Sequence, residues 1–249
     1  MKISVITAVY NNQATLADAL NSVLAQDHPN VELIVVDGGS TDGTLEIIQR
    51  YAGQLAQVVS EPDCGIYDAL NKGLRLATGD AVGFLHSDDT FADDHVLSRI
   101  ATALADLKVD ACYGDLRYVR HDNPNHVVRH WRAGSYHPRL LAQGWMPPHP
   151  TLYLRRALYE RHGGFNLRYR IAADYDLMLR MLSRVEGQVV YLPEVLVHMR
   201  LGGISNRSLR HILRKSWEDY RVLRTNRIGG IGALAWKNLS KLPQFFFKG

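Results

Sequence analysis

The sequence predicts an α/β fold in which a mostly parallel, twisted sheet is flanked by helices. The main observation is an alternation: within the first 106 residues, a β-rich apolar segment is followed four times by a segment with helical spacing. A second observation is that the fourth apolar run, residues 81–85, ends in two adjacent carboxylates, Asp88 and Asp89. Polar side chains at the carboxyl end of a buried parallel strand face the ligand crevice of such a sheet.

Each element follows from a local pattern. In residues 14–26, Leu16, Ala19, Leu20 and Val23 recur at helical spacing after the β-rich segment KISVITAVY. The same alternation repeats along the chain, and because connections between parallel strands are right-handed, it predicts βαβ units. The predicted strands are 2–10, 31–37, 57–61 and 81–89, and the predicted helices are 14–26, 44–53, 65–79 and 93–106.

Two common nucleotide-binding motifs are absent. The first strand leads into NNQAT, which lacks the GxGxxG turn of dinucleotide-binding proteins, so the sequence argues against a dehydrogenase. The loop GGSTDGT, residues 38–44, spaces its glycines like a Walker A loop. Thr44 stands where that loop needs a lysine, which argues against an NTPase.

Acidic residues follow three of the predicted strands. Asp88 and Asp89 repel each other, so a divalent cation that holds a diphosphate is one interpretation, and a turn with a helix cap is the other. Asp37 could accept a hydrogen bond from the imide N–H of uracil or thymine, or could cap the glycine-rich turn that follows it. The segment SEPD, residues 60–63, adds a third acidic corner.

The helix 65–79 places Asp68 and Lys72 on one face, together with Asn71 and Arg75. On an exposed helix this face would carry a solvated ion pair. Alternatively, Asp68 and Lys72 border the site of a bound diphosphate.

Four motifs carry a resemblance. In order and spacing, SVITAVYNN, VVDGGSTDGT, SEPDCGIYDALNKGLRLATGD and FLHSDD resemble the nucleotide-binding half of family 2 inverting glycosyltransferases with the GT-A fold, of the kind that act in bacterial polysaccharide or colanic-acid-type biosynthesis. The resemblance extends over most of residues 1–205. It implies that Asp88 and Asp89 serve the ribose and the metal-diphosphate, although His86 replaces an aspartate that many relatives have. It also implies that the nucleotide sugar is bound by Thr7, Val9, Asn11, Asp37, Asp63, Asp68, Lys72, Ser87, Asp88 and Arg200.

The second half is expected to serve the acceptor. Residues 111–131 form a predicted hairpin with a turn at 122–125, and residues 147–156, a predicted loop, resemble the segment that closes over the donor and acceptor in the family. His149 in that loop is a candidate acceptor contact or a loop-filling residue. The histidines at 121, 126, 130, 137 and 149 match no metal-ligand spacing.

The helix expected near residues 169–182 begins with AADYD. The resemblance makes Asp174 the catalytic base and Asp176 a second candidate, while Ala173 replaces the glutamate that usually precedes the base. The alternative is that both carboxylates only stabilise the helix N-terminus.

The C-terminal segment is strongly basic. Residues 200–249 contain eleven Lys or Arg and two acidic residues, a formal charge of +9. In the predicted helix the apolar residues Leu209, Ile212, Leu213, Trp217, Tyr220 and Leu223 form one stripe, which could pack on the core or face an anionic membrane. We therefore predict a GT-A domain over 1–207, divided into 1–110 and 111–207, and a basic amphipathic helical extension over 208–249.

These observations and the resemblance lead to one expected activity. The protein would transfer a hexosyl unit, with inversion, from a nucleoside diphosphate sugar, favouring UDP, to a glycan or lipid-linked acceptor, with Mn²⁺ or Mg²⁺ as cofactor. The alternatives are a sugar-phosphate nucleotidyltransferase and a non-catalytic nucleotide-sugar scaffold.

The expected setting is the inner face of the cell membrane, to which the protein would bind peripherally from the cytoplasm, and nucleic acid is not an expected partner. The two cysteines lack a CxxC pattern and are expected to be free thiols. No apolar run is long enough to span a bilayer. The sequence indicates no oligomeric state.

Overall fold

The computed structural model describes residues 1–201 and 209–239, and within them a mixed sheet of nine strands organises the fold. The strand order is β3-β2-β1-β4-β8-β6-β9-β5, and β7 pairs with β6 outside this path. The strands are β1 (Ile3–Val9), β2 (Val31–Asp37), β3 (Gln57–Ser60), β4 (Ala81–Phe84), β5 (Thr90–Phe91), β6 (Val109–Arg120), β7 (Val127–Trp131), β8 (Tyr153–Arg155) and β9 (Gln188–Leu201).

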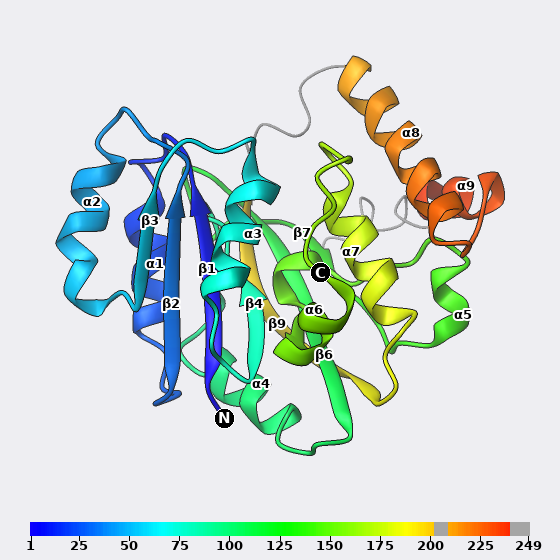
Figure 1. Ribbon diagram of the computed structural model, residues 1–249, viewed down its shortest axis with the longest axis horizontal. Helices are drawn as coiled ribbons and strands as arrows, with labels where there is room; N and C mark the ends of the chain where they lie inside the picture. The colour runs from blue at the N-terminus through cyan, green and yellow to red at the C-terminus, as the bar shows by residue number, and fades with distance from the viewer. Residues whose placement is uncertain (202–208, 240–249) are drawn as a thin grey trace.

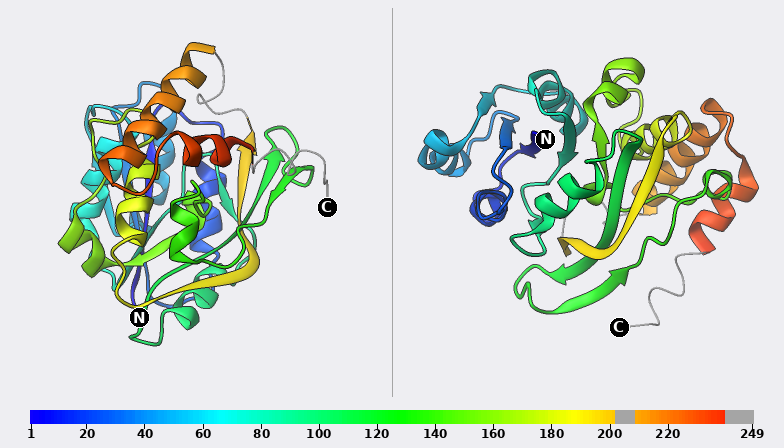
Figure 2. Two further views of the ribbon diagram at one scale, coloured as in Figure 1. Left: turned by 90° about the vertical axis from the view of Figure 1, so that its right-hand side faces the viewer. Right: turned by 90° about the horizontal axis from the view of Figure 1, so that it is seen from below.

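The alternation predicted for the first half is confirmed. Strands β3, β2, β1 and β4 are parallel, and β1 and β2 run in register from Ile3 opposite Val31 to Val9 opposite Asp37. β1 and β4 are fully buried, because helices cover both faces of this part of the sheet (Figure 2). The helices of this half are α1 (Leu16–Leu24), α2 (Thr44–Tyr51), the short 3-10 turn η1 (Ala52–Gln54), α3 (Ile66–Leu76) and α4 (Val96–Ala103).

The second half differs from the prediction at residues 147–156. We expected a loop, but after the 3-10 turn η2 (His149–Thr151) the chain forms β8, which lies antiparallel between β4 and β6. β8 has only three residues, too few for a period-two pattern to be read in a sequence. Gly83 of β4 permits this pairing, because a Cβ at that position would collide with the Tyr153 ring. The predicted hairpin is confirmed as β6 and β7, whose pairing closes with the 122–125 turn outside both strands.

The remaining helices are α5 (Pro138–Leu141), α6 (Arg156–His162), α7 (Ala173–Leu182), α8 (Leu209–Thr225) and α9 (Ile231–Leu239). Figure 1 shows α2 at one end of the long axis of the molecule and α8 and α9 at the other. In all views α8 and α9 lie beside each other, and α8 packs against α7. Within the described residues, every helix is too short or too polar to cross a lipid bilayer.

The predicted apolar stripe of α8 is divided between the surface and the core. Leu213 is 70% and Trp217 57% exposed, whereas Leu223 is buried, as are Val222, Glu218 and Asp219. The two carboxylates can be buried because both have partners inside the protein, as described below. The side chains of Leu209 and Ile212, the proposed domain boundary at 207/208 and the segment LPQFFFKG lie outside what the structure describes.

Candidate active site

The loops that follow β1, β2 and β4 are joined by hydrogen bonds at the carboxyl edge of the sheet. The Asn11 amide donates to Ser40 Oγ (2.8 Å), and the Asn11 side chain accepts from the Thr41 amide (2.8 Å). Asn11 has a φ of 47°, a left-handed conformation that asparagine tolerates better than most residues. The Asn12 side chain donates to Ser87 Oγ (2.9 Å). The edge therefore presents one connected, polar surface built from three strand ends.

Asp37 lies at this edge but is buried and hydrogen-bonded to its own loop and to Ser60 at the end of β3. Its carboxylate accepts from the amides of Gly39 and Ser40 at 3.1–3.2 Å, from Ser60 Oγ at 2.7 Å and from Ser40 Oγ. It is 0% exposed. In this arrangement Asp37 performs the turn-capping role that we considered as the alternative, and its contact with a base remains a prediction.

Asp63, Asp68 and Lys72 hold the loop between β3 and α3. Asp63 accepts from the Gly65 amide (2.7 Å), and Asp68 accepts from the Cys64 amide (3.1 Å). Lys72 Nζ binds Glu61 (2.8 Å) and the Pro62 carbonyl (3.0 Å). The loop after β2 and the loop after β3 lie so close together that a Cβ at Gly38 would collide with the Asp63 carboxylate. These side chains bind backbone groups and so fix the conformation of the loop between β3 and α3.

Asp88 and Asp89 follow β4 in different environments. Asp88 is half-buried, and Asp89 is 0% exposed with its Oδ2 lacking any hydrogen-bond partner. Burial, and then the neighbouring charge of Asp88, raise the pKa of Asp89 well above its usual value. The Arg200 amide lies 3.3 Å from Asp89 Oδ1, and the Arg200 guanidinium binds Asp18 (2.6 Å).

This pair fits a divalent cation. A buried carboxylate oxygen without a partner is costly, and a bound cation would stabilise it in its charged form. Among the described residues no group of three His, Cys, Asp or Glu side chains is placed to hold a metal ion. Asp88 and Asp89 would therefore supply part of a ligand set, and the oxygens of a diphosphate could supply the rest.

A series of polar side chains connects the carboxyl end of β4 with α7. His86 Nε2 lies 2.9 Å from His149 Nε2, His149 Nδ1 lies 3.8 Å from Asp174 Oδ2, and the Tyr67 hydroxyl lies 3.3 Å from Asp174 Oδ1. Burial lowers the pKa of both histidines, although the charge of Asp174 opposes the effect at each. The Asp174 side chain is 23% exposed and lies beside His149, which connects it to His86.

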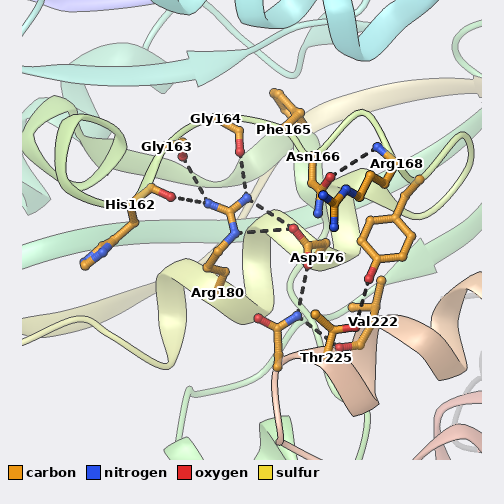
Figure 3. A network of polar contacts seen from close by, with 12 residues as sticks. His162, Gly163, Gly164, Phe165, Asn166, Arg168, Asp176, Arg180, Val222 and Thr225 are labelled. Atoms are coloured by element: carbon orange, nitrogen blue, oxygen red, sulfur yellow. Dashed lines mark hydrogen bonds and ion pairs between the residues drawn. The ribbon is translucent and has the colours of Figure 1, made fainter.

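Asp176, the second candidate, lies in a different environment. Its side chain is 3% exposed, forms an ion pair with Arg180 (3.2 Å) and accepts from Asn226 Nδ2 (3.0 Å). Figure 3 shows that Arg180 also donates to the carbonyls of the loop after α6, at His162, Gly163 and Gly164. Asp176 thus anchors α7 to that loop and to α8, and it is inaccessible to a substrate in this conformation.

Some residues at the site were not predicted. Tyr67 carries a hydroxyl that donates to the Ile171 carbonyl (2.7 Å), and its pKa is raised by burial and by Asp174. Tyr10 is 62% exposed and lies beside Gly38, where an aromatic ring could stack on a base. Neither tyrosine has a local pattern that could have indicated a role. Of the predicted residues, Val9 and Thr7 are buried within β1, and Thr7 Oγ1 has no hydrogen-bond partner.

Comparisons with known proteins agree with this architecture. Among solved structures, a TarS fragment, residues 1–349, from S. aureus in complex with UDP-GlcNAc superimposes with a TM-score of 0.72 at 22% identity, over 92% of this chain and 66% of that one. This chain covers only 39% of a longer TarS structure. A mannosyltransferase from Pyrobaculum calidifontis in complex with GDP-Man and Mn²⁺ matches over 98% of this chain and 73% of its own, with a TM-score of 0.67 at 22% identity. The predicted GT-A fold is thereby confirmed.

Curated sequences give closer relationships. A PGL/p-HBAD biosynthesis glycosyltransferase of Mycobacterium bovis is 34% identical over 208 residues, 82% of this chain and 78% of the relative. An uncharacterized glycosyltransferase of Nostoc sp. is 30% identical over 83% of this chain and 66% of the relative. The model of the family "Glycosyl transferase family 2" matches residues 4–169. The chain belongs to glycosyltransferase family 2, as its motifs predicted.

Proposed function

We propose that this glycosyltransferase transfers a hexosyl unit from a UDP-sugar to a glycan or lipid-linked acceptor, with inversion at the anomeric carbon and with a divalent cation. The observation that carries the proposal is the position of Asp174. It is a partly exposed carboxylate that the His86–His149 pair connects to the strand end bearing Asp88. A single displacement needs a base for the acceptor and a separate site for the diphosphate, and this arrangement offers a candidate for each.

In the proposed reaction Asp174 accepts the proton of the acceptor hydroxyl as the acceptor oxygen forms a bond to the anomeric carbon. The bond from that carbon to the diphosphate oxygen breaks, and the electron pair leaves with the nucleoside diphosphate. The sugar passes through an oxocarbenium-like state. A cation held by Asp88 and Asp89 would neutralise the leaving diphosphate.

Asp174 suits the role of base better than Asp176. General-base catalysis needs a carboxylate within hydrogen-bond reach of the substrate proton. Asp174 is partly exposed and has only long contacts, at 3.3 and 3.8 Å, whereas Arg180 and Asn226 bind the Asp176 carboxylate. His149, which we first considered as an acceptor contact, touches Asp174 and His86 and would orient the base.

We also propose that the described part of the C-terminal segment contacts an anionic membrane, where a lipid-linked acceptor would be found. Leu213 and Trp217 are exposed on α8, and the Arg221 guanidinium lies 4.6 Å from the Trp217 ring centre. Exposed aromatic and aliphatic residues beside arginines favour the interface of an anionic bilayer. Ile231 and Trp236 of α9 are exposed as well.

A donor panel tests the proposed activity. Purified protein is incubated with UDP-, GDP- and other nucleoside diphosphate sugars, Mn²⁺ or Mg²⁺, and membrane extract as the acceptor source, and release of the nucleoside diphosphate is measured. We expect release from a UDP-sugar, and the anomeric configuration of the product, read by NMR, tests inversion. Binding of UDP without release from any donor would support a non-catalytic scaffold instead.

A further inference from the structure

The helix that carries Asp174 lacks a capping residue of its own. Residue Ala172 stands at the N-cap of α7 and makes no side-chain hydrogen bond. Serine, threonine, aspartate and asparagine are the usual N-caps, because the first amides of a helix have no partner within it. Ala172 is 1% exposed, so water has little access to these amides.

An acceptor for the N-cap amide, that of Ala172, and for the amide before it comes from α8. Glu218 Oε2 accepts from the amides of Ile171 (2.8 Å) and Ala172 (3.1 Å), which are 47 and 46 residues away in the sequence. Glu218 is 3% exposed, and its other oxygen lies 3.3 Å from Arg214 Nε. A buried carboxylate that accepts two amide hydrogens at a helix N-terminus is stabilised by charge-assisted bonds and by the helix dipole.

The peptide that Glu218 holds is fixed on its other side as well. The Ile171 carbonyl accepts from Tyr67, whose hydroxyl also lies beside Asp174. Asp174 itself is two residues after Ala172. A shift of α8 would therefore move the backbone from which the base projects.

Other contacts strengthen this connection between α8 and the start of α7. Asn226 donates to Asp176, and the Tyr169 hydroxyl lies 3.2 Å from Thr225 Oγ1. Figure 3 shows Asp176 facing the part of α8 that carries Val222 and Thr225. Every one of these partners lies in a segment that the sequence analysis assigned to an appended extension.

We propose that Glu218 is a positioning residue for the transfer reaction: it caps α7 from α8 and fixes the backbone that carries Asp174. This inference rests on the proposed function, since it takes Asp174 as the base. It assigns the C-terminal helix to the catalytic architecture of the enzyme, in addition to any membrane contact made by its outer face.

Two substitutions with side chains about as long as that of glutamate distinguish the capping role of Glu218 from its contribution to packing. Glu218→Gln keeps a side-chain oxygen that can accept from both amides, whereas Glu218→Met fills the same space without an acceptor. We expect Glu218→Met to lower kcat about 10- to 100-fold, since a displacement of about 1 Å in an active site can cost about 100-fold. The Kd for UDP should stay within about twofold, and Glu218→Gln should recover most of kcat.

Lys215→Met is the matched control on the same helix. Lys215 is 44% exposed and binds Asp219 (3.0 Å), which keeps its second partner, Lys237 (2.9 Å), after the substitution. We expect wild-type kcat for this variant. Thermal unfolding verifies that all three variants are folded at the assay temperature.

Amide hydrogen exchange supplies a readout that is independent of catalysis. Glu218→Met should accelerate exchange at Ile171 and Ala172, and Glu218→Gln should accelerate it much less. Unchanged exchange in folded Glu218→Met overturns the cap, and wild-type kcat despite faster exchange overturns the positioning role. A wild-type protein that releases diphosphate from no donor overturns the proposed function and the positioning role with it, while exchange alone still decides the cap.

Discussion

Replacing each of the two aspartates of the AADYD motif by asparagine should have different effects on stability and on turnover. Asp176 is 3% exposed and is held by Arg180 and Asn226, so Asp176→Asn breaks a buried ion pair. Loss of one partner from such a pair costs about 3–5 kcal/mol. Arg180 retains three carbonyl acceptors and Asn226 can still donate to the new amide oxygen, so we expect the lower end, about 3 kcal/mol.

This destabilisation should be visible in a melting experiment. For a chain of this size, 1 kcal/mol shifts Tm by about 2–4 °C, so Asp176→Asn should melt roughly 6–12 °C below the wild type. Below its melting range the Asp176→Asn variant should retain a measurable kcat, because the Asp176 carboxylate that it lacks does not meet the acceptor in the wild type.

Asp174→Asn should behave in the opposite manner. Its contacts are long and its side chain is partly exposed, so stability should change by less than about 1 kcal/mol. Turnover should fall by about 100- to 10,000-fold, the contribution of a general base, while UDP still binds. Calorimetry and diphosphate release on the two variants decide the matter. Wild-type Tm with lost turnover in Asp176→Asn, or wild-type turnover in Asp174→Asn, would refute the assignment.

Three further perturbations follow from the structure. If Asp88 and Asp89 hold a cation, EDTA should weaken UDP binding in isothermal titration and Asp89→Ala should lose this metal dependence; equal affinity with and without EDTA contradicts the site. Burial raises the pKa of Glu32, but hydrogen bonds from Lys2, Ser4 and Thr78 outweigh burial and lower that pKa from 4.5 to about 2. The carboxylate therefore stabilises the fold fully above pH 4.5, and this stabilisation is lost as the pH falls toward 2. Glu32→Gln should therefore be less stable than the wild type at pH 7, by roughly 3 kcal/mol, with the difference closing by pH 2 in urea unfolding; a constant difference speaks against it. Trp217→Ala should reduce sedimentation with anionic vesicles at 0.1 M salt and Leu107→Ala, an 85% exposed control, should not; equal sedimentation removes the support for a membrane contact.

Local patterns were sufficient for much of the first half of the fold. Alternation and helical spacing depend on neighbours two to four residues apart, and β1 to β4 and α1 to α4 follow them, although β4 ends at Phe84 instead of residue 89. The two-residue strand β5 was not predicted, because it forms by pairing with the distant β9. The strand-end carboxylates Asp37, Asp88 and Asp89 could be assigned to one edge because parallel strands share their direction. The family could be inferred because the spacing of the four motifs is itself a property of the sequence.

What the patterns missed depends on contacts between distant segments. The three residues of β8 become a strand only because β4 and β6 lie on either side of them. Asp174 and Asp176 are equivalent in the sequence, and they differ because His149 and Tyr67 meet one while Arg180 and Asn226 enclose the other. In α8 the periodic pattern leaves open which residues face the core, and it gives no sign that Glu218 is buried. That burial is favourable because the Glu218 carboxylate accepts from the amides of Ile171 and Ala172. Apart from Arg180, which is four residues from Asp176, these partners are separated by tens of residues in the chain, and only the folded structure brings them close together.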